Sequence, residues 1–453
     1  MAQDRVTCNA PASSRRDFLK TASALAAAGT MAGGLSIARG AHAAGSDVLR
    51  IGLIGCGGRG TGAAANAIGA DKNCKLVALA DAFSDRLDSS LRNLKKAAEQ
   101  MEAPQKVAVD KDHCFVGLDA ADKLIQSDVD VVLLAEPPHF RPMHLKAAID
   151  AGKHVFCEKP VAVDAQGVRS VLASAEQAKK KNLSLVSGLC WRYDQGVMET
   201  MKRVHDGAIG EIRSIQVTYM GGPLSPRDRK PDWTEMQYQL RNWQYFVWLS
   251  GDFNAEQHVH SLDKAAWAMK DATPKRAWGL GGCLLRDRKA GDVYDHHAVT
   301  YEYDNGVHVH AYCRQMPGCF NDVSDVFVGT KGRAVLPNYP GKPYIEGENA
   351  WKFKGITPLS QAYDEEHRRL FASIRAGQAL NNGEYMAKST MWAVIGRLAD
   401  YTGQRITWDK AMNSQENLTP AAYAFDAEPP TKPDKDGVYP IALPGVTKLV
   451  VPE

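Results

Sequence analysis

The chain has 453 residues, with 55 Lys or Arg against 52 Asp or Glu and a formal net charge of +3. Five of the basic and two of the acidic residues lie in residues 1–43, so 50 of each remain if that segment is removed. A balanced charge gives no support for binding to nucleic acid or to an anionic membrane, and the length suffices for two domains.

Residues 1–43 have the pattern of a twin-arginine export signal. Arg15 and Arg16 precede a weakly apolar stretch rich in Ala and Gly, and Ala41-His42-Ala43 offers a small-residue cleavage site. A membrane anchor is the alternative, but the stretch contains too much Gly, Ser and Thr to span a bilayer stably. We therefore predict a periplasmic protein that has lost residues 1–43 and has no membrane partner.

Residues 49–81 have the spacing of a strand, a glycine turn, a helix and a second strand. The turn is Gly55-Cys56-Gly57-Gly58-Arg59-Gly60, and the second apolar run ends in Asp81. Gly55 permits the tight turn, Gly57 lets the backbone approach a pyrophosphate, and Gly60 lets the helix pack closely against the strand. The helix N-terminus is suited to bind the phosphates, and Asp81 lies where a carboxylate accepts hydrogen bonds from a ribose.

A glycine motif alone is also compatible with an ordinary loop, but here the two strands, the helix and the acidic terminus accompany it. We therefore predict a nicotinamide dinucleotide site. Asp81 favours NAD because a carboxylate repels a 2′-phosphate, whereas Arg59 and Arg86 leave NADP open. The predicted cofactor contacts in this part of the chain are Gly55, Gly57, Gly58, Arg59, Gly60 and Asp81.

Further apolar runs predict that residues 47–190 form one doubly wound α/β domain. An almost wholly apolar strand over 128–135 ends in Glu136-Pro137-Pro138-His139, and a strand over 154–157 ends in Glu158-Lys159-Pro160. Both corners are expected at the carboxyl edge of a parallel sheet, where ligands bind. The other elements predicted here are helices over 84–101, 140–151 and 165–181 and strands over 107–109 and 184–188.

Four motifs in this order resemble the Gfo/Idh/MocA family, which includes glucose–fructose oxidoreductase and inositol dehydrogenase. They are the glycine turn over 55–60, Asp81, the prolines of 137–139, and Ala-Gly-Lys-His-Val-Phe-Cys-Glu-Lys-Pro over 151–160. The resemblance implies an α/β fold with an N-terminal Rossmann domain and an α+β C-terminal domain that has an open, mainly antiparallel sheet. It adds to the expected cofactor contacts Pro137, His139, Glu158, Lys159 and Arg192.

β-branched and aromatic runs after residue 190 fit this second domain, which we expect over 191–414. Asp304-Asn305-Gly306 joins two of the runs as a hairpin turn. A helix around 365–375 is expected to return to the first domain, and the proline-rich residues 415–453 to form an extended tail over the surface or towards another subunit. The strands predicted are 212–220, 276–280, 297–303, 307–312, 323–329 and 333–336.

Glu256 and His260 carry the chemistry that the resemblance implies. Residues four apart share a helical face, so both side chains can reach one substrate. By resemblance His260 is the general base, a role suited to the unperturbed pKa of histidine, and Lys159 orients and polarises the reacting oxygen. Glu256 replaces the Asp usual in the family. A metal site with His258 is the alternative, but His258 and His260 are expected to point to different faces, so no metal is predicted.

Aromatic and polar residues between 232 and 248 suit a sugar, because aromatic rings pack on C–H faces while amides and guanidinium groups bind hydroxyls. A packed helix core or a subunit interface is the alternative. Tyr193 beside Arg192 either contacts the substrate or bridges the domains, and His297 either contacts the substrate or bonds between strands. The substrate contacts predicted are Tyr193, Trp233, Arg241, Trp243 and His297.

These observations predict an exported NAD(P)-dependent oxidoreductase that acts on a sugar or polyol and recycles a tightly bound cofactor, because a periplasm keeps no free nicotinamide. The alternatives are an NAD-dependent glycoside hydrolase that oxidises its sugar transiently, and a non-catalytic carbohydrate-binding protein on the same fold. The presence of both Lys159 and His260 counts against the last. The protein is expected to form a homo-dimer or homo-tetramer and to bind no nucleic acid, and Cys313 and Cys319 are candidates for a disulfide.

Overall fold

The first domain is built on a six-stranded parallel sheet with the strand order β3-β2-β1-β4-β5-β6. The computed structural model describes residues 48–356 and 358–451, so the predicted export signal lies outside the described residues. The strand order reverses between β1 and β4, and such a point opens a crevice at the carboxyl ends of the strands. The strands are β1 Leu49–Ile54, β2 Cys74–Asp81, β3 Cys114–Val116, β4 Val131–Leu134, β5 His154–Cys157 and β6 Leu185–Ser187.

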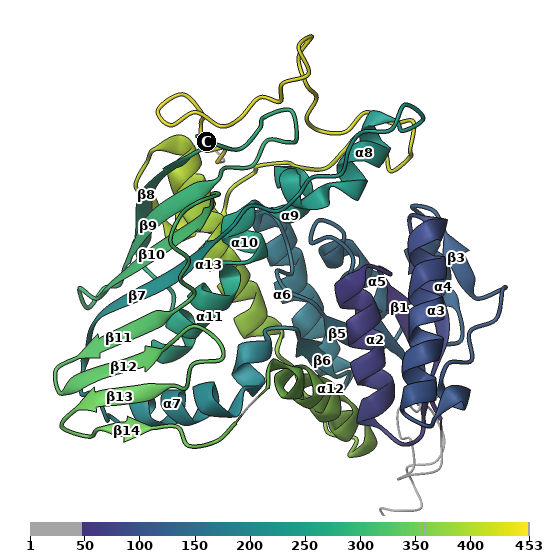
Figure 1. Ribbon diagram of the computed structural model, residues 1–453, viewed down its shortest axis with the longest axis horizontal. Coiled ribbons are helices and arrows are strands. Elements are labelled where there is room, and N and C mark those ends of the chain that lie inside the picture. Colours follow the sequence, from purple (N-terminus) through teal and green to yellow (C-terminus); the bar gives the residue numbers. More distant parts are fainter. Residues whose placement is uncertain (1–47, 357, 452–453) are drawn as a thin grey trace, which may run out of the picture. The chain divides into compact units, whose positions relative to one another are not determined.

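Helices cover both faces of this sheet, which explains why its strands are apolar throughout (Figure 1). The strand expected over 107–109 is wrong, because Val107 forms only a single bridge to Leu76. The outer strand of the sheet is instead β3, which was not predicted because three residues are too few to show an alternating pattern. One face packs on α2 Gly58–Ala70, α3 Ser84–Gln100 and α12 Leu359–Arg375, and the other on α4 Ala120–Gln126, α5 Arg141–Asp150 and α6 Ala165–Lys180.

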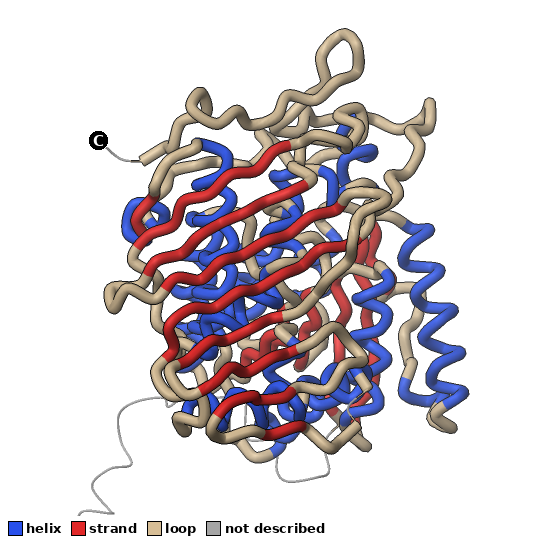
Figure 2. Tube along the Cα trace, turned by 60° about the vertical axis from the view of Figure 1, so that its left-hand side comes forward, coloured by secondary structure: helices blue, strands red, loops and turns tan. Residues whose placement is uncertain are grey.

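The second domain carries a nine-stranded sheet with the order β14-β13-β12-β11-β7-β10-β9-β8-β15 (Figure 2). Its pairs are antiparallel except for β10 beside β7, and the turn 304–306 joins β9 to β10, so the expected open, mainly antiparallel sheet is confirmed. The strands are β7 Ile212–Gly221, β8 Arg276–Gly282, β9 His296–Glu302, β10 His308–Gln315, β11 Asp325–Gly329, β12 Gly332–Leu336, β13 Tyr344–Gly347, β14 Trp351–Lys352 and β15 Ile406–Thr407.

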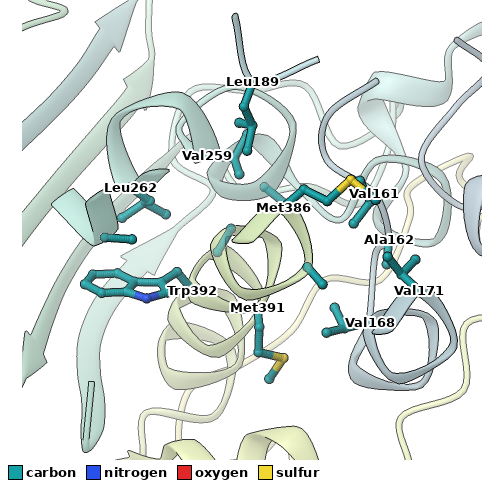
Figure 3. Packing of buried hydrophobic residues seen from close by; sticks show 14 of the residues in the cluster. Val161, Ala162, Val168, Val171, Leu189, Val259, Leu262, Met386, Met391 and Trp392 are labelled. Atoms are coloured by element: carbon teal, nitrogen blue, oxygen red, sulfur yellow. The ribbon is translucent and has the colours of Figure 1, made fainter. Parts of the chain in front are cut away.

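Helix α13, Gly383–Thr402, lies in the core that joins the two domains. Figure 3 shows Met386 and Met391 of α13 near Val161 and Val168 of the first domain, whereas Trp392 lies on the side of Leu262 in α11, Val259–Ala268. Because one buried apolar cluster contains residues of both domains, they share a continuous core, which keeps the edge of the first sheet in a fixed relation to the second domain.

The C-terminal tail runs in an extended form along α8, Glu235–Arg241, and α9, Val247–Ser250 (Figure 1, yellow). Its Tyr439 is fully buried and packs edge-on against the ring of Phe246 at 5.0 Å. The candidate disulfide is not formed: Cys313 is buried, Cys319 is exposed, and both are free thiols. Among the described residues, no helix combines the length and apolarity needed to cross a bilayer.

Replacing Gly60 by Ala should destabilise the first domain. A Cβ at Gly60 would stand 1.8 Å from the carbonyl oxygen of Gly55, so β1 and α2 would have to separate. We expect the free energy of unfolding to fall by about 1–3 kcal/mol, measured by urea unfolding. Gly69→Ala in the same helix is the control, because its nearest atom is the Met101 methyl at 3.9 Å. Equal stability of the two variants would contradict the close packing at Gly60.

Candidate functional site

A cavity of about 790 Å³ lies at the carboxyl edge of the parallel sheet, lined by the first domain and by residues 225–260 of the second. Its volume is in the range of small-molecule sites. The sequence-predicted site residues that line it are Gly55, Gly57, Gly58, Arg59, Gly60, Asp81, Pro137, Glu158, Lys159, Arg241, Trp243, Glu256 and His260.

The glycine turn leaves the N-terminus of α2 open towards the cavity. Gly55 has φ of +92°, which favours glycine, and no described side chain caps α2 at Gly57. The Asp81 carboxylate accepts the backbone N–H groups of Cys56 at 2.7 Å and Phe83 at 2.9 Å, and burial raises its pKa. A carboxylate has further lone pairs for hydroxyl groups, and an uncapped helix N-terminus suits phosphates, so the turn fits a dinucleotide.

Arg59 joins the glycine turn to two other elements. Its guanidinium pairs with Glu158 at the end of β5 and with Glu366 of α12 at 3.0 Å, and it lies 4.3 Å from the Tyr363 ring centroid. Burial disfavours the Glu158 carboxylate, but Arg59, Arg141 and Lys159 together outweigh it and lower the pKa of Glu158, whereas burial raises the pKa of Glu366. We infer that, of the two glutamates beside Arg59, Glu158 is the one that carries the negative charge. Both Arg59 and Glu158 line the cavity while bound to each other.

Lys159 and Glu256 meet across the boundary between the domains. The Lys159 Nζ donates to the backbone carbonyl oxygen of Glu256 at 2.5 Å and lies 3.6 Å from its carboxylate Oε1. Gln257 was not predicted, although it neighbours Glu256 in sequence. Its Nε2 donates to the same Oε1 at 3.1 Å, and Tyr219 donates its hydroxyl to the Gln257 Oε1 at 3.1 Å. This chain of hydrogen bonds orients the Glu256 side chain beside the ammonium group.

The shared helical face expected for Glu256 and His260 is wrong. Glu256 ends α10, Phe253–Glu256, whereas His260 lies in the first turn of α11, and Gln257 and His258 interrupt the helix. Both side chains nevertheless line the cavity. Burial, and next the charge of Lys159, lower the pKa of His260 well below its usual value, so its imidazole is neutral. A neutral imidazole beside an ammonium group can accept a proton.

His258 takes no part in a metal site. It is fully buried, with Nδ1 3.1 Å from the Asn254 Oδ1, and it does not line the cavity. In the described part of the chain no group of three or more His, Cys, Asp or Glu could hold a metal ion.

Two predicted cofactor contacts, His139 and Arg192, and one predicted substrate contact, Tyr193, lie outside the cavity lining. His139 packs on Trp248, and its Nε2 lies 2.8 Å from the Tyr423 hydroxyl of the tail. Arg192 donates to Asp263 at 3.0 Å and to Asp271, and its guanidinium lies 3.9 Å from the Tyr385 ring centroid. Tyr193 is buried and donates to the Asn382 Oδ1 at 2.8 Å. Partners from distant parts of the chain hold all three.

Two predicted substrate contacts also lie elsewhere. The Trp233 ring packs under the guanidinium of Arg241 at 4.8 Å and is not part of the cavity wall. His297 is buried, with Nδ1 2.8 Å from the Asp400 carboxylate and Nε2 3.4 Å from that of Asp252. Burial disfavours the imidazolium, but Asp252 and Asp400 outweigh it and raise the pKa of His297 to about 9.

Arg141 is a site residue that sequence reasoning missed. Its guanidinium is buried and donates to the carbonyl oxygen of Pro160 at 2.6 Å and to that of Glu136 at 2.5 Å. It therefore ties the corner after β4 to the corner after β5, two of the places where predicted site residues follow a strand. Its position in the first turn of the helix after Pro137-Pro138 was the available signal. The other lining residues that were not predicted include Phe83, His144, Gln257 and Tyr363.

Comparison with known families assigns two segments of the chain. Residues 49–185 match the family model described as an oxidoreductase family with an NAD-binding Rossmann fold, and residues 197–335 match the GFO/IDH/MocA C-terminal domain. An inositol 2-dehydrogenase of Paracoccus denitrificans is 31% identical over 298 residues, which cover 65% of this chain and 75% of that protein. The chain belongs to the Gfo/Idh/MocA oxidoreductase family. The dinucleotide class and the Rossmann domain predicted from residues 49–81 are thereby confirmed.

Other relatives agree with this assignment. A myo-inositol 2-dehydrogenase of Thermotoga maritima is 26% identical over 341 residues, covering 73% of this chain and 89% of that protein. Among solved structures, a levoglucosan dehydrogenase in complex with NADH and levoglucosan has a TM-score of 0.62 at 18% identity, over 80% of this chain and 99% of that chain. An aldose–aldose oxidoreductase from Caulobacter crescentus has a TM-score of 0.62 at 18% identity, over 79% and 99%. At such identities the structural likeness establishes the fold.

The free energy of unfolding should fall as the pH rises from about 6.5 to about 9, the usual and the folded-state pKa of His297. A histidine with a raised pKa in the folded chain contributes its full stabilisation below its unfolded pKa and loses it through the folded one. We expect a decrease of up to about 3 kcal/mol, measured by urea unfolding across this interval. His297→Gln should lack this part of the pH dependence. An unchanged slope in the variant would show that another group titrates.

Proposed function

We propose that the cavity is the active site of a dehydrogenase that oxidises a hydroxyl group of a sugar or polyol. The observation that carries the proposal is the meeting of Lys159 with Glu256, beside His260, in the cavity that also contains the glycine turn. The relatives named inositol 2-dehydrogenase and myo-inositol 2-dehydrogenase support the substrate class.

Two side chains divide the work on the substrate hydroxyl group. The Lys159 ammonium, held by the carbonyl oxygen of Glu256, donates a hydrogen bond to the reacting oxygen and stabilises the negative charge that develops there. His260, kept neutral by burial and by Lys159, takes the hydroxyl proton on a ring nitrogen. A bound nicotinamide would accept the hydride that leaves the carbon atom bearing this hydroxyl group.

The walls of the cavity offer both polar and aromatic groups to a polyol. Arg241 and Trp243 line it, as do Gln244 and Gln257, whose side chains end in amides. Amide groups bind hydroxyls in both directions, and an aromatic face packs against C–H groups. The pattern supports a neutral, hydroxylated substrate.

Replacing Lys159 by Met should lower turnover of myo-inositol about 10²-fold or more, because the charge on the reacting oxygen loses its donor. His260→Asn should lower it about 10²- to 10⁴-fold, because the proton loses its acceptor. Turnover is measured as reduction of the bound nucleotide in protein that has been loaded with NAD. Lys146→Met is the control, because its exposed ammonium pairs with Asp150 on the surface.

Unchanged turnover in both variants would contradict these roles. Release of the aglycone from a glycoside, without a second carbonyl substrate, would favour the NAD-dependent glycoside hydrolase instead. Polyol binding without turnover in the unaltered protein would favour the non-catalytic carbohydrate-binding protein.

We further propose that the cofactor remains bound between turnovers. Support comes from contacts that tie the second domain and the tail to the loop after β2. Arg241 of α8 pairs with Asp85 at 2.9 Å, and its guanidinium lies 3.8 Å from the Phe83 ring centroid. Phe83 in turn stacks on Phe425 of the tail at 5.5 Å. Because Phe83 and Asp85 follow Asp81, these contacts lie beside the expected ribose site, where they would slow release of the nucleotide.

A retained cofactor suits a protein that is exported after folding. On the twin-arginine pattern at Arg15 and Arg16 we propose a periplasmic location. Leu280 in β8 is 66% exposed, and Leu284 just after this strand is 74% exposed. Exposed apolar side chains of this kind support a homo-oligomer, either a dimer or a tetramer.

Replacing Arg241 by Ala should speed the loss of bound nucleotide about tenfold, because it removes both the pair with Asp85 and the contact with the Phe83 ring. The rate is measured by diluting protein loaded with NADH and following the nicotinamide fluorescence. Arg333→Ala is the control, since it removes an exposed pair with Glu346 on the second sheet. Equal rates of nucleotide loss in the two variants would show that Arg241 does not help to retain the cofactor.

A further inference from the structure

Asp252 has a backbone conformation that residues other than glycine avoid. It lies immediately before α10 with φ of 74° and ψ of 166°, and it follows Gly251, which also has a positive φ of 75°. Such a conformation persists only where the surroundings hold it, and it often occurs near functional sites. Four residues later in the chain is Glu256.

The Asp252 carboxylate is fully buried and bound on all sides. One oxygen accepts the backbone N–H of Phe253, and the other accepts the N–H of Tyr294 at 3.1 Å and the hydroxyl of Tyr401. The second oxygen also lies 3.4 Å from the His297 Nε2. These contacts hold the strained residue in place.

His297 connects this carboxylate to rigid parts of the second domain. It belongs to β9, and its Nδ1 lies 2.8 Å from the carboxylate of Asp400 in α13, the helix shared by the cores of both domains. The imidazole thus stands between two buried carboxylates, one from α13 and one from the start of α10. None of the three side chains lines the cavity.

The backbone of Asp252 determines the position of Glu256. The Asp252 carbonyl oxygen accepts the N–H of Ala255 at 3.0 Å and that of Glu256 at 2.8 Å, so it begins the single turn of α10. The Glu256 carbonyl oxygen is the acceptor for Lys159, and the next residue, Gln257, accepts the N–H of His260 at 3.2 Å. A shift of Asp252 would therefore move Glu256 away from Lys159 and disturb the start of α11.

We propose that His297 is a positioning residue, which acts through Asp252 to hold Glu256 and His260 at the cavity. The catalytic part of this inference rests on the proposed function, whereas the structural part does not. His297 itself touches neither the cavity nor a reacting atom. Its effect passes along the path from Asp400 through His297 and Asp252 to the backbone of α10.

The first test is amide hydrogen exchange in the full-length protein saturated with NADH. His297→Gln should speed exchange of the amides over 253–260 about tenfold or more, while peptides of the parallel sheet keep their rates. In protein loaded with NAD instead, the rate of reduction of the bound nucleotide at saturating myo-inositol should fall about tenfold or more, while the half-saturating concentration of myo-inositol should change little, because the catalytic groups are misplaced and the cavity wall is retained. Asp400→Asn should act in the same direction and serves if His297→Gln does not fold.

The decisive variant is Asp252→Gly, which adopts the same backbone conformation without strain. In this background His297→Gln should change the exchange of 253–260 less than twofold, because Asp252 is the route of its effect. Asp71→Asn is the control, since it removes a pair between Asp71 and Arg375 far from α10 in sequence. It should leave exchange over 253–260 unchanged.

Two results would overturn the inference. One is faster exchange spread evenly over both domains in His297→Gln, which would indicate a purely structural histidine. The other is a full effect of His297→Gln in the Asp252→Gly background. Absence of turnover of every sugar and polyol in a panel that includes myo-inositol, together with the local exchange effect, would contradict the proposed function and leave the positioning role intact.

Discussion

The ion pair between Arg59 and Glu158 is the contact on which the geometry of the cavity depends. It joins the glycine turn after β1 to the end of β5, and Glu366 of α12 approaches the same guanidinium. Because Lys159 follows Glu158 directly, the pair also determines where the ammonium group stands relative to the helix N-terminus. Removing one partner of a buried pair leaves an uncompensated charge and costs about 3–5 kcal/mol, so the arrangement resists local change.

The second domain supplies the groups that complete the site. Helix α13 packs against α6 on one side and against the large sheet on the other, so the edge of the first sheet and the segment 252–260 are parts of one core. Arg141 links the corners after β4 and β5, while Asp252 and His297 anchor the start of α10. The hydride-transfer site that we propose is therefore assembled from two rigid halves, with Lys159 and Glu256 at the junction.

Local signals in the sequence predicted most of the first domain. Strand β1 and strand β5 lie where the apolar runs indicated, and the residues of the glycine turn, Asp81, Glu158 and Lys159 all line the cavity. These features depend on short spacings, such as a turn between a strand and a helix, which a single sequence displays. The hairpin at 304–306 was predictable for the same reason.

Long-range partners could not be predicted from local patterns. Arg192 binds Asp263, 71 residues away, and His139 binds Tyr423, 284 residues away, so residues that resembled ligand contacts are held by partners distant in the sequence. His297 likewise lies between Asp252 and Asp400. The break between α10 and α11 arises from tertiary contacts at Asp252, which override the helical spacing of Glu256 and His260.

The most direct measurement follows a deuterium atom from the carbon of a polyol. Protein loaded with NAD is mixed with carbon-deuterated myo-inositol, denatured after one turnover, and the released nucleotide is weighed by mass spectrometry. If the cavity is a hydride-transfer site, the nucleotide is reduced and carries one deuterium. Conversion of the polyol with an unlabelled nucleotide, and deuterium in the water, would contradict the account.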